Sequence, residues 1–203
     1  KICPPSLAED WDNVGLLLGS RQKKVDKILT CLTIDKAVVD EAIAEGVDCI
    51  VSHHPFPFHS AKKWTTDTTD GTLLLKLVGA QISVYSPHTA HDSAFFGVNR
   101  QLAEGLCLVD VKPLYEGKLP ATREMLAGLD AEEEEYLAGT IKAGEAQLGT
   151  GRIGRLSEPK KFSEFIAQIK DMLQIEGALA VGPDDRLIKT VAIGCGAADD
   201  FIG

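Results

Sequence analysis

Apolar segments alternate with helix-like segments through the first half of the chain. Residues 28–34 (ILTCLTI), 47–51 (VDCIV) and 82–85 (ISVY) predict short buried strands, because each is an apolar run of strand length. The segments between them repeat apolar residues at helical spacing and end at a glycine, Gly46 or Gly79. Strands separated by single helices favour parallel crossovers, so the sequence predicts an α/β fold with mainly parallel sheet strands.

Polar side chains follow each of these predicted strands. Asp35 comes after the first strand, His53 and His54 after the second, and His88 and then Asp92 after the third. In open α/β sheets, ligands bind beyond the carboxyl ends of the strands. We therefore expect these three polar clusters, far apart in the sequence, to meet at one edge of the sheet and to form the functional site there.

The residue types at this edge favour a metal. Neutral imidazole is the commonest metal ligand among side chains, and mixed histidine and carboxylate sites suit Zn, Mn, Fe or Ni better than Ca or Mg. Four of the five histidines in the chain lie at two of these strand ends, which makes a metal site a better interpretation than hydrogen-bonded loop histidines. The fifth, His59, is expected at the surface or on the substrate side of the site.

Several polar residues near the predicted site have a simpler interpretation. Asp35 is a good helix N-cap, and this is the more ordinary role for it. Asp12 and Asn13 precede an apolar run and are either turn residues or partners that orient an imidazole, as metal sites usually require. Thr89 is expected only to shape the turn before Asp92.

The second half of the chain is less regular. A change of composition near residue 113 predicts two domains, residues 1–112 with the histidine motifs and residues 113–203. In the second of these, apolar spacing predicts a helix around residues 162–169 and strands at residues 178–181 and 188–193.

A glycine motif in the second half resembles a dinucleotide-binding fingerprint. Gly149, Gly151 and Gly154 satisfy the pattern G-x-G-x-x-G. That fingerprint requires a helix to begin at the motif, but Pro159 follows too soon for a long helix. We therefore expect no dinucleotide to bind here.

Composition excludes further classes. The formal net charge of −9 opposes non-specific binding of nucleic acid, which requires a basic surface. No apolar run approaches the length of about 18 residues that spans a membrane, and the first residues lack the apolar run of a signal peptide. Five scattered cysteines without a CxxC pair favour a reducing, cytoplasmic location. The acidic run at residues 130–135 is expected to be a solvated helix face.

Several longer motifs resemble the NIF-three-like family, whose members are often labelled GTP cyclohydrolase I type 2 homologues. The matching segments are PPSLAEDWDNVGLLLG (residues 4–19), HHP (53–55), HTAHDSAFFGVN (88–99), GTGRIGRL (149–156) and VAIGCGAADDF (191–201). This resemblance implies an α/β fold of two related halves, a dinuclear centre of divalent metal ions and a toroidal homohexamer.

The resemblance also implies roles for single residues. By motif position, His53 binds one metal, while His54 and Asp92 bind the other. His88 lies beside the centre as a catalytic, proton-transferring residue, and His91 receives no role. The family adds a histidine and a glutamate from a C-terminal motif, but no histidine follows His91. We therefore expect the second half to be truncated at its C-terminus.

Two functional hypotheses follow from the motifs. The first is a dinuclear metal-dependent hydrolase acting on a small molecule, with the family label pointing to hydrolysis of a purine nucleotide such as GTP. The alternative is a non-catalytic metal-binding regulator or a scaffold that binds a partner. The metal ions themselves, Zn, Mn, Fe or Ni, are not distinguished by the sequence.

Overall fold

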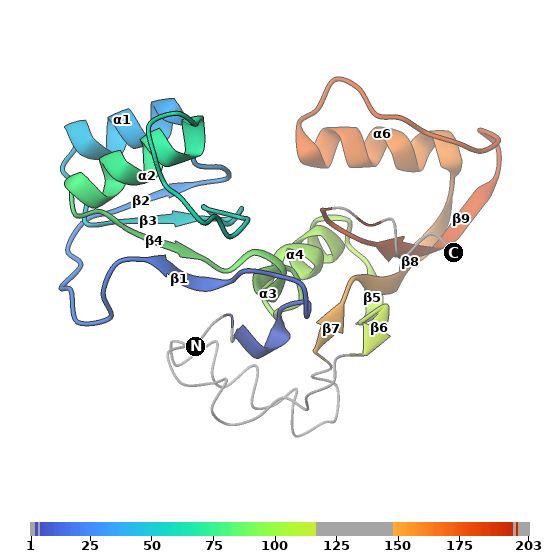
Figure 1. Cartoon of the computed structure of the whole chain (residues 1–203). Coiled ribbons are helices and arrows are strands. Elements are labelled where there is room, and N and C mark those ends of the chain that lie inside the picture. The colour runs from blue at the N-terminus through green and yellow to red at the C-terminus, as the bar shows by residue number, and fades with distance from the viewer. Residues whose placement is uncertain (1–2, 4, 117–147, 197, 199–203) are drawn as a thin grey trace. The chain divides into compact units, whose positions relative to one another are not determined.

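The computed structural model describes residues 3, 5–116, 148–196 and 198 (Figure 1). Contacts divide the chain into two compact units: Ala8–Ala90, here called the parallel-sheet unit, and Lys1–Leu7 with His91–Gly203, here called the antiparallel-sheet unit. These contacts divide the chain near residue 90. The predicted division into two domains at residue 112 stays a prediction. In the described part of the chain, no helix is long and apolar enough to cross a membrane.

The parallel-sheet unit contains a four-stranded sheet in the order β1-β4-β3-β2. Its strands are β1 (Gly15–Leu18), β2 (Ile28–Cys31), β3 (Cys49–Ser52) and β4 (Ser83–Ser86). β2, β3 and β4 run parallel to one another, while β1 pairs antiparallel with β4. The predicted parallel strands are therefore confirmed in this unit.

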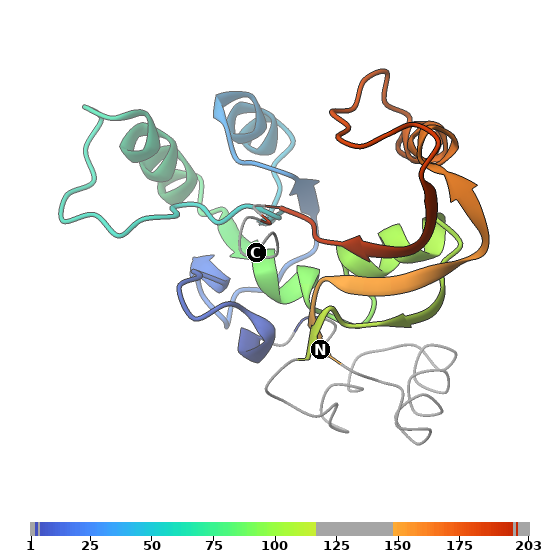
Figure 2. The same cartoon turned by 90° about the vertical axis from the view of Figure 1, so that its right-hand side faces the viewer.

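Two helices, α1 (Lys36–Ala44) and α2 (Thr69–Gly79), cover one face of this sheet (Figures 1 and 2). The core beneath them is apolar, and the side chains of Ile50 and Leu77 are fully buried in it. Asp35 caps α1, because its Oδ1 accepts a hydrogen bond of 2.9 Å from the backbone N–H of Val38. The ordinary interpretation of Asp35 is thus confirmed.

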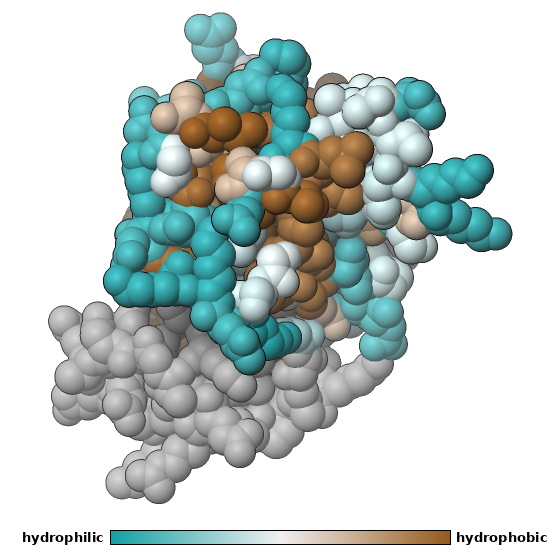
Figure 3. All heavy atoms as spheres, turned by 60° about the vertical axis from the view of Figure 1, so that its left-hand side comes forward, coloured by the Kyte–Doolittle hydropathy of each residue, from teal (hydrophilic) through white to brown (hydrophobic). Residues whose placement is uncertain are grey.

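Large apolar side chains remain exposed on the parallel-sheet unit. Figure 3 shows hydrophobic surface bordered by hydrophilic residues on the side of the molecule where this unit lies. The exposed large apolar residues of the unit are Trp11, Val25, Ile28, Leu32, Ile43, Phe58, Leu75 and Val78. Among them, Ile28 of the edge strand β2 alternates with the half-buried Leu29, as expected for a strand with one covered face.

The antiparallel-sheet unit contains strands of two to ten residues. Its described elements are η1 (Pro5–Leu7), α4 (Val98–Gly105), β5 (Val109–Lys112), β6 (Tyr115–Glu116), β7 (Gly149–Thr150), β8 (Arg152–Lys161), α6 (Phe162–Leu173) and β9 (Leu187–Ile193). β5, β8 and β9 form one antiparallel sheet, and β6 pairs with β7. The α/β class is confirmed, with the parallel strands confined to the other unit.

The helix predicted around residues 162–169 and the strand predicted at 188–193 are confirmed as α6 and β9. The strand predicted at residues 178–181 is wrong. Leu179 is 98% exposed and Val181 is 89% exposed, so neither finds the apolar neighbours that a strand would need. The acidic run at residues 130–135 lies outside the described residues.

The glycine motif leads into a strand. Gly154 lies within β8, so no helix N-terminus follows the motif, as predicted. Instead, Arg152 is only 2% exposed and donates hydrogen bonds to the carbonyl oxygens of Gly149 (2.7 Å), Gly151 (2.6 Å) and Ala94 (3.0 Å). Burial lowers the pKa of this guanidinium to about 10. The glycine motif therefore supplies two of the three carbonyl oxygens that hold the buried side chain of Arg152. This arrangement is here called the arginine clamp.

Candidate metal centre

His53 and His54 directly follow β3, and hydrogen bonds fix the backbone of both. The N–H of His53 donates to the carbonyl of Cys31 at 3.0 Å, and the N–H of His54 donates to that of Leu32 at 2.9 Å. These bonds extend the pairing with β2 past the end of the strand. The two histidines thus stand on a backbone held by its neighbour, at the carboxyl edge of the sheet.

Two buried serines hold the carbonyl groups of the same histidines. The hydroxyl of Ser52 donates to the carbonyl of His54 at 2.8 Å, and that of Ser86 donates to the carbonyl of His53 at 2.6 Å. Both serines are fully buried, and each is the last residue of its strand. The sequence interpretation missed them, although a serine ending both β3 and β4 was a visible signal.

His88 begins the short helix α3 (His88–Asp92), which follows β4. Its φ of 34° is in the left-handed region, which is uncommon for residues other than glycine. Such backbone strain is found preferentially at functional sites. The strained residue stands at the third strand end where the sequence predicted a site.

Asp12 orients the imidazole of His88. Asp12 Oδ1 lies 2.8 Å from His88 Nδ1 and also accepts from the backbone N–H of Asn13 at 2.7 Å. Its other oxygen accepts from the backbone N–H of Thr89 at 3.2 Å and from the hydroxyl of Thr89. Asp12 is therefore an orienting partner of an imidazole, the second of the two interpretations. Thr89, expected only to shape a turn, holds this carboxylate.

The carboxyl group of Asp12 is stabilised as an anion. Burial of its side chain opposes ionisation, but the hydrogen bonds from Thr89, His88 and the N–H of Asn13 outweigh that effect. Together they hold the pKa of Asp12 below its usual value. A carboxylate that accepts from one imidazole nitrogen leaves the other nitrogen, Nε2 of His88, for a ligand or a proton.

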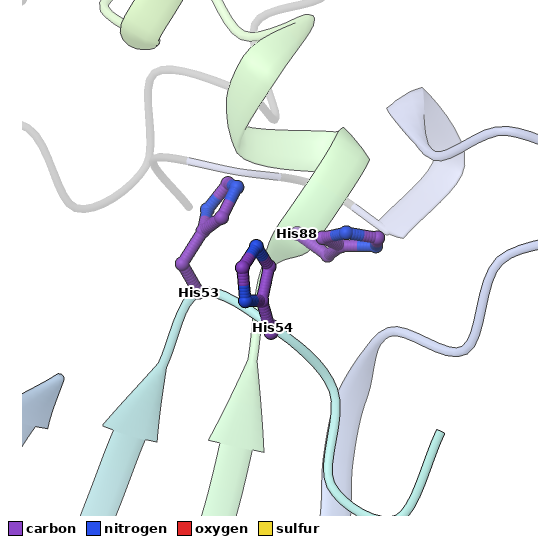
Figure 4. A group of neighbouring side chains, drawn as sticks. All are labelled: His53, His54 and His88. Atoms are coloured by element: carbon purple, nitrogen blue, oxygen red, sulfur yellow. The ribbon is translucent and has the colours of Figure 1, made fainter. Parts of the chain in front are cut away.

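The three imidazoles converge (Figure 4). One potential ligand atom from each of His53, His54 and His88 lies within 4.8 Å of the others. The ring centroids are 5.3 Å apart for His53 and His54, 5.3 Å for His53 and His88, and 5.9 Å for His54 and His88. The predicted meeting of polar groups at one sheet edge is confirmed for these three, here called the histidine cluster.

The donor set of the histidine cluster suits a borderline transition metal. Imidazole nitrogens bind such ions, and an imidazole ligand is usually oriented by a hydrogen bond on its other nitrogen. His88 Nδ1 has that bond to the carboxylate of Asp12, and His54 Nδ1 lies 2.7 Å from Thr33 Oγ1. Two of the three rings are thus oriented as metal ligands are.

Asp92 lies at the end of α3 and belongs to the antiparallel-sheet unit. It is buried, and its carbonyl accepts a hydrogen bond of 3.1 Å from the side chain of Asn99, whose Oδ1 accepts from the N–H of Cys195 at 2.9 Å. Burial and the neighbouring Asp92 raise the pKa of the Cys195 thiol to about 12. The predicted ligand set of His53, His54 and Asp92 stays a prediction.

His59 is not part of the histidine cluster, and its surroundings differ. It is exposed and its ring contacts that of Phe58, with 4.6 Å between centroids. This agrees with the expectation of a surface position. His91 lies within α3 and belongs to the antiparallel-sheet unit.

The fold and the site together define an α/β protein with a histidine cluster at the carboxyl edge of a parallel sheet. Residues 1–203 match the Duf34/NIF3 family (NGG1p interacting factor 3), and the chain belongs to that family. It is 32% identical, over 200 residues, to a Clostridium acetobutylicum protein named GTP cyclohydrolase 1 type 2 homolog. That match covers 98% of this chain and 66% of the relative, so the chain spans about two thirds of its length.

Solved structures agree with this membership. A Staphylococcus aureus hypothetical protein is similar with a TM-score of 0.77 at 28% identity, covering 98% of this chain and 70% of that one. A Bacillus cereus protein related to NIF3 has a TM-score of 0.78 at 23% identity, covering 99% of this chain and 75% of that one, a likeness of fold alone. The resemblance drawn from the motifs is confirmed.

Proposed function

We propose that the protein is a metal-dependent hydrolase whose centre includes the histidine cluster. The observation that carries this proposal is the convergence of three imidazoles within 4.8 Å, one of them oriented by a buried carboxylate. A bound divalent ion would supply Lewis acidity, the property that metal hydrolases use.

The residue roles in this proposal combine the motifs with the geometry. His53 would hold one ion and His54 with Asp92 a second, as the family resemblance implies. His88 would carry a proton through Nε2, because Asp12 engages its Nδ1 at 2.8 Å.

The proposed substrate is a purine nucleotide, and the reaction is hydrolysis. Support comes from the name of the clostridial relative, GTP cyclohydrolase 1 type 2 homolog. A net charge of −9 requires local attraction for an anionic nucleotide, which bound divalent ions would provide. The activity of the whole protein belongs to this proposal as well, because relatives are longer than the chain.

The test is an assay of purified protein loaded in turn with Zn, Mn or Fe and supplied with GTP. We expect product only with metal, none with His53→Ala, and an unchanged rate with the control Asp26→Ala, an exposed aspartate outside the cluster. Metal content is measured for each variant. An occupied centre without turnover for any metal would refute the hydrolase and favour a metal-binding regulator or scaffold.

Assembly and location complete the proposal. We propose a homohexamer, as the family resemblance implies, and light scattering of the purified protein tests it. A cytoplasmic location is supported by the five cysteines, all of which are free thiols. Fractionation of cells that express the tagged protein would test this location.

A further inference from the structure

Two exposed aromatic rings flank the histidine cluster. Trp11 is 63% exposed and Phe58 is 41% exposed, and their ring centroids are 6.4 Å apart at an interplanar angle of 68°. Both are neighbours of His88, with centroid distances of 6.1 Å for Trp11 and 6.3 Å for Phe58. Trp11 and Phe58 are here called the aromatic rim. They lie beside the imidazole of His88 in the proposed centre.

The backbone beneath the aromatic rim is fixed. The side chain of Asn13 donates a hydrogen bond of 3.0 Å to the carbonyl of Pro57, which joins the segment of Trp11 to that of Phe58. Asp12, adjacent to Trp11, is bound to His88 and Thr89. The same short segment thus orients the imidazole and presents the indole, so the distance between the two rings is built into the local structure.

Exposing these two rings to water costs free energy as long as no ligand covers them. A tryptophan is usually highly buried, because its large apolar surface gains from removal from water. Here the core of the unit lies under α1 and α2, and Trp11 is not part of it. A broad π face that is open to solvent and held in place is the feature on which planar rings stack in nucleic-acid-binding proteins.

We propose that the aromatic rim is a stacking site for a planar heteroaromatic ring of the substrate. This inference rests on the proposed function, since it assigns the substrate class of the same centre. A ring stacked on Trp11 lies in van der Waals contact with it, about 3.5–4 Å away. Because the indole is only 6.1 Å from His88, the ring itself and its directly attached groups come next to the histidine cluster.

This geometry also indicates which bond of the substrate is hydrolysed. Groups at the far end of a long substituent, such as the terminal phosphate of a nucleoside triphosphate, lie several bonds beyond the stacked ring. The site therefore acts on the ring or on a bond attached directly to it. The carbon–nitrogen or carbon–oxygen bond breaks, the hydroxyl group of a water molecule bonds to the carbon, and the proton of that water goes to the leaving nitrogen or oxygen. Atoms therefore balance without an oxidant or a reductant.

Binding of ring and ring-less probes to the zinc-loaded protein tests this inference. The probes are the monophosphates of guanosine and cytidine, nicotinamide mononucleotide, and ribose 5-phosphate as the matched probe without a ring. Titration calorimetry should show that the ring probes bind about tenfold or more tightly than ribose 5-phosphate. Trp11→Ala should weaken the ring probes by about tenfold and leave ribose 5-phosphate unchanged, whereas Trp11→Phe should retain most of the affinity.

The controls separate this inference from the proposed function. Leu179→Ala removes an apolar side chain elsewhere that is even more exposed than Trp11 and should change nothing. Zinc stoichiometry should be the same in all variants, because neither Trp11 nor Leu179 belongs to the histidine cluster. Equal binding of ring and ring-less probes, no binding of any ring probe, or full ring affinity in Trp11→Ala would each overturn the stacking site. Ring binding that depends on Trp11 without turnover would overturn only the hydrolase.

Discussion

Replacing Asp12 tests whether one carboxylate organises the candidate centre. The side chain of Asp12 is fully shielded from solvent and accepts hydrogen bonds from His88, Thr89 and the N–H of Asn13. A hydrogen bond to a charged group contributes about 1.5–3 kcal/mol, but such bonds within one network are not additive. The side chain of His88 is 16% exposed, so water can replace part of what is lost. We expect Asp12→Ala to cost about 2–4 kcal/mol of unfolding free energy.

The isosteric change Asp12→Asn keeps the shape and one acceptor oxygen but turns an NH₂ group toward donors. We expect it to cost about half as much as Asp12→Ala. Both variants should also lower the turnover of the metal-loaded protein by about 10–100-fold, because the proton-carrying imidazole of His88 loses the partner that orients it. Urea denaturation monitored by circular dichroism measures the first effect, and the assay of the metal-loaded protein with GTP measures the second.

A matched control is Asp26→Ala, because Asp26 is an aspartate on the surface of the same unit, with a side chain 68% exposed. Its removal should change the unfolding free energy by less than about 0.5 kcal/mol and leave the turnover intact. The reasoning is refuted if Asp12→Ala behaves like this control in both measurements. A loss of stability with normal turnover would assign Asp12 to the fold alone.

Three further predictions concern the fold. Ile50→Ala, at a fully buried position, should cost about 2–5 kcal/mol in urea denaturation, and a cost under 1 kcal/mol would contradict the described core. Arg152→Met should cost about 2–4 kcal/mol by the same assay, because three carbonyl oxygens lose a buried donor, and a neutral result would contradict the clamp. Asp40, paired with Lys36 and Lys76, has its pKa lowered from 3.8 to about 2, so its stabilising contribution is present above pH 3.8 and disappears as the pH falls through about 2. A carboxyl NMR titration should give a midpoint near 2 that rises in Lys76→Ala, and an unchanged midpoint in that variant would refute the pairing.

Local sequence patterns were sufficient for the elements of the parallel-sheet unit. β3, β4 and α2 form where short apolar runs and helical spacing predict them, because each element is decided by neighbours in the chain. The same approach failed at residues 178–181, where an apolar run finds no packing partner and Leu179 stays exposed. Apolar character predicts a strand only where other elements cover it.

The sequence by itself determined that histidines end two parallel strands, and topology then required them to share an edge. Only the tertiary structure decided how they are held. Asp12 and His88 are 76 residues apart, and Ser86 and His53 are 33 apart, so no local pattern could pair them. Motif and spacing select which residues carry the chemistry, whereas hydrogen bonds between distant segments decide which nitrogen of an imidazole remains available, because orientation depends on groups that only folding brings together.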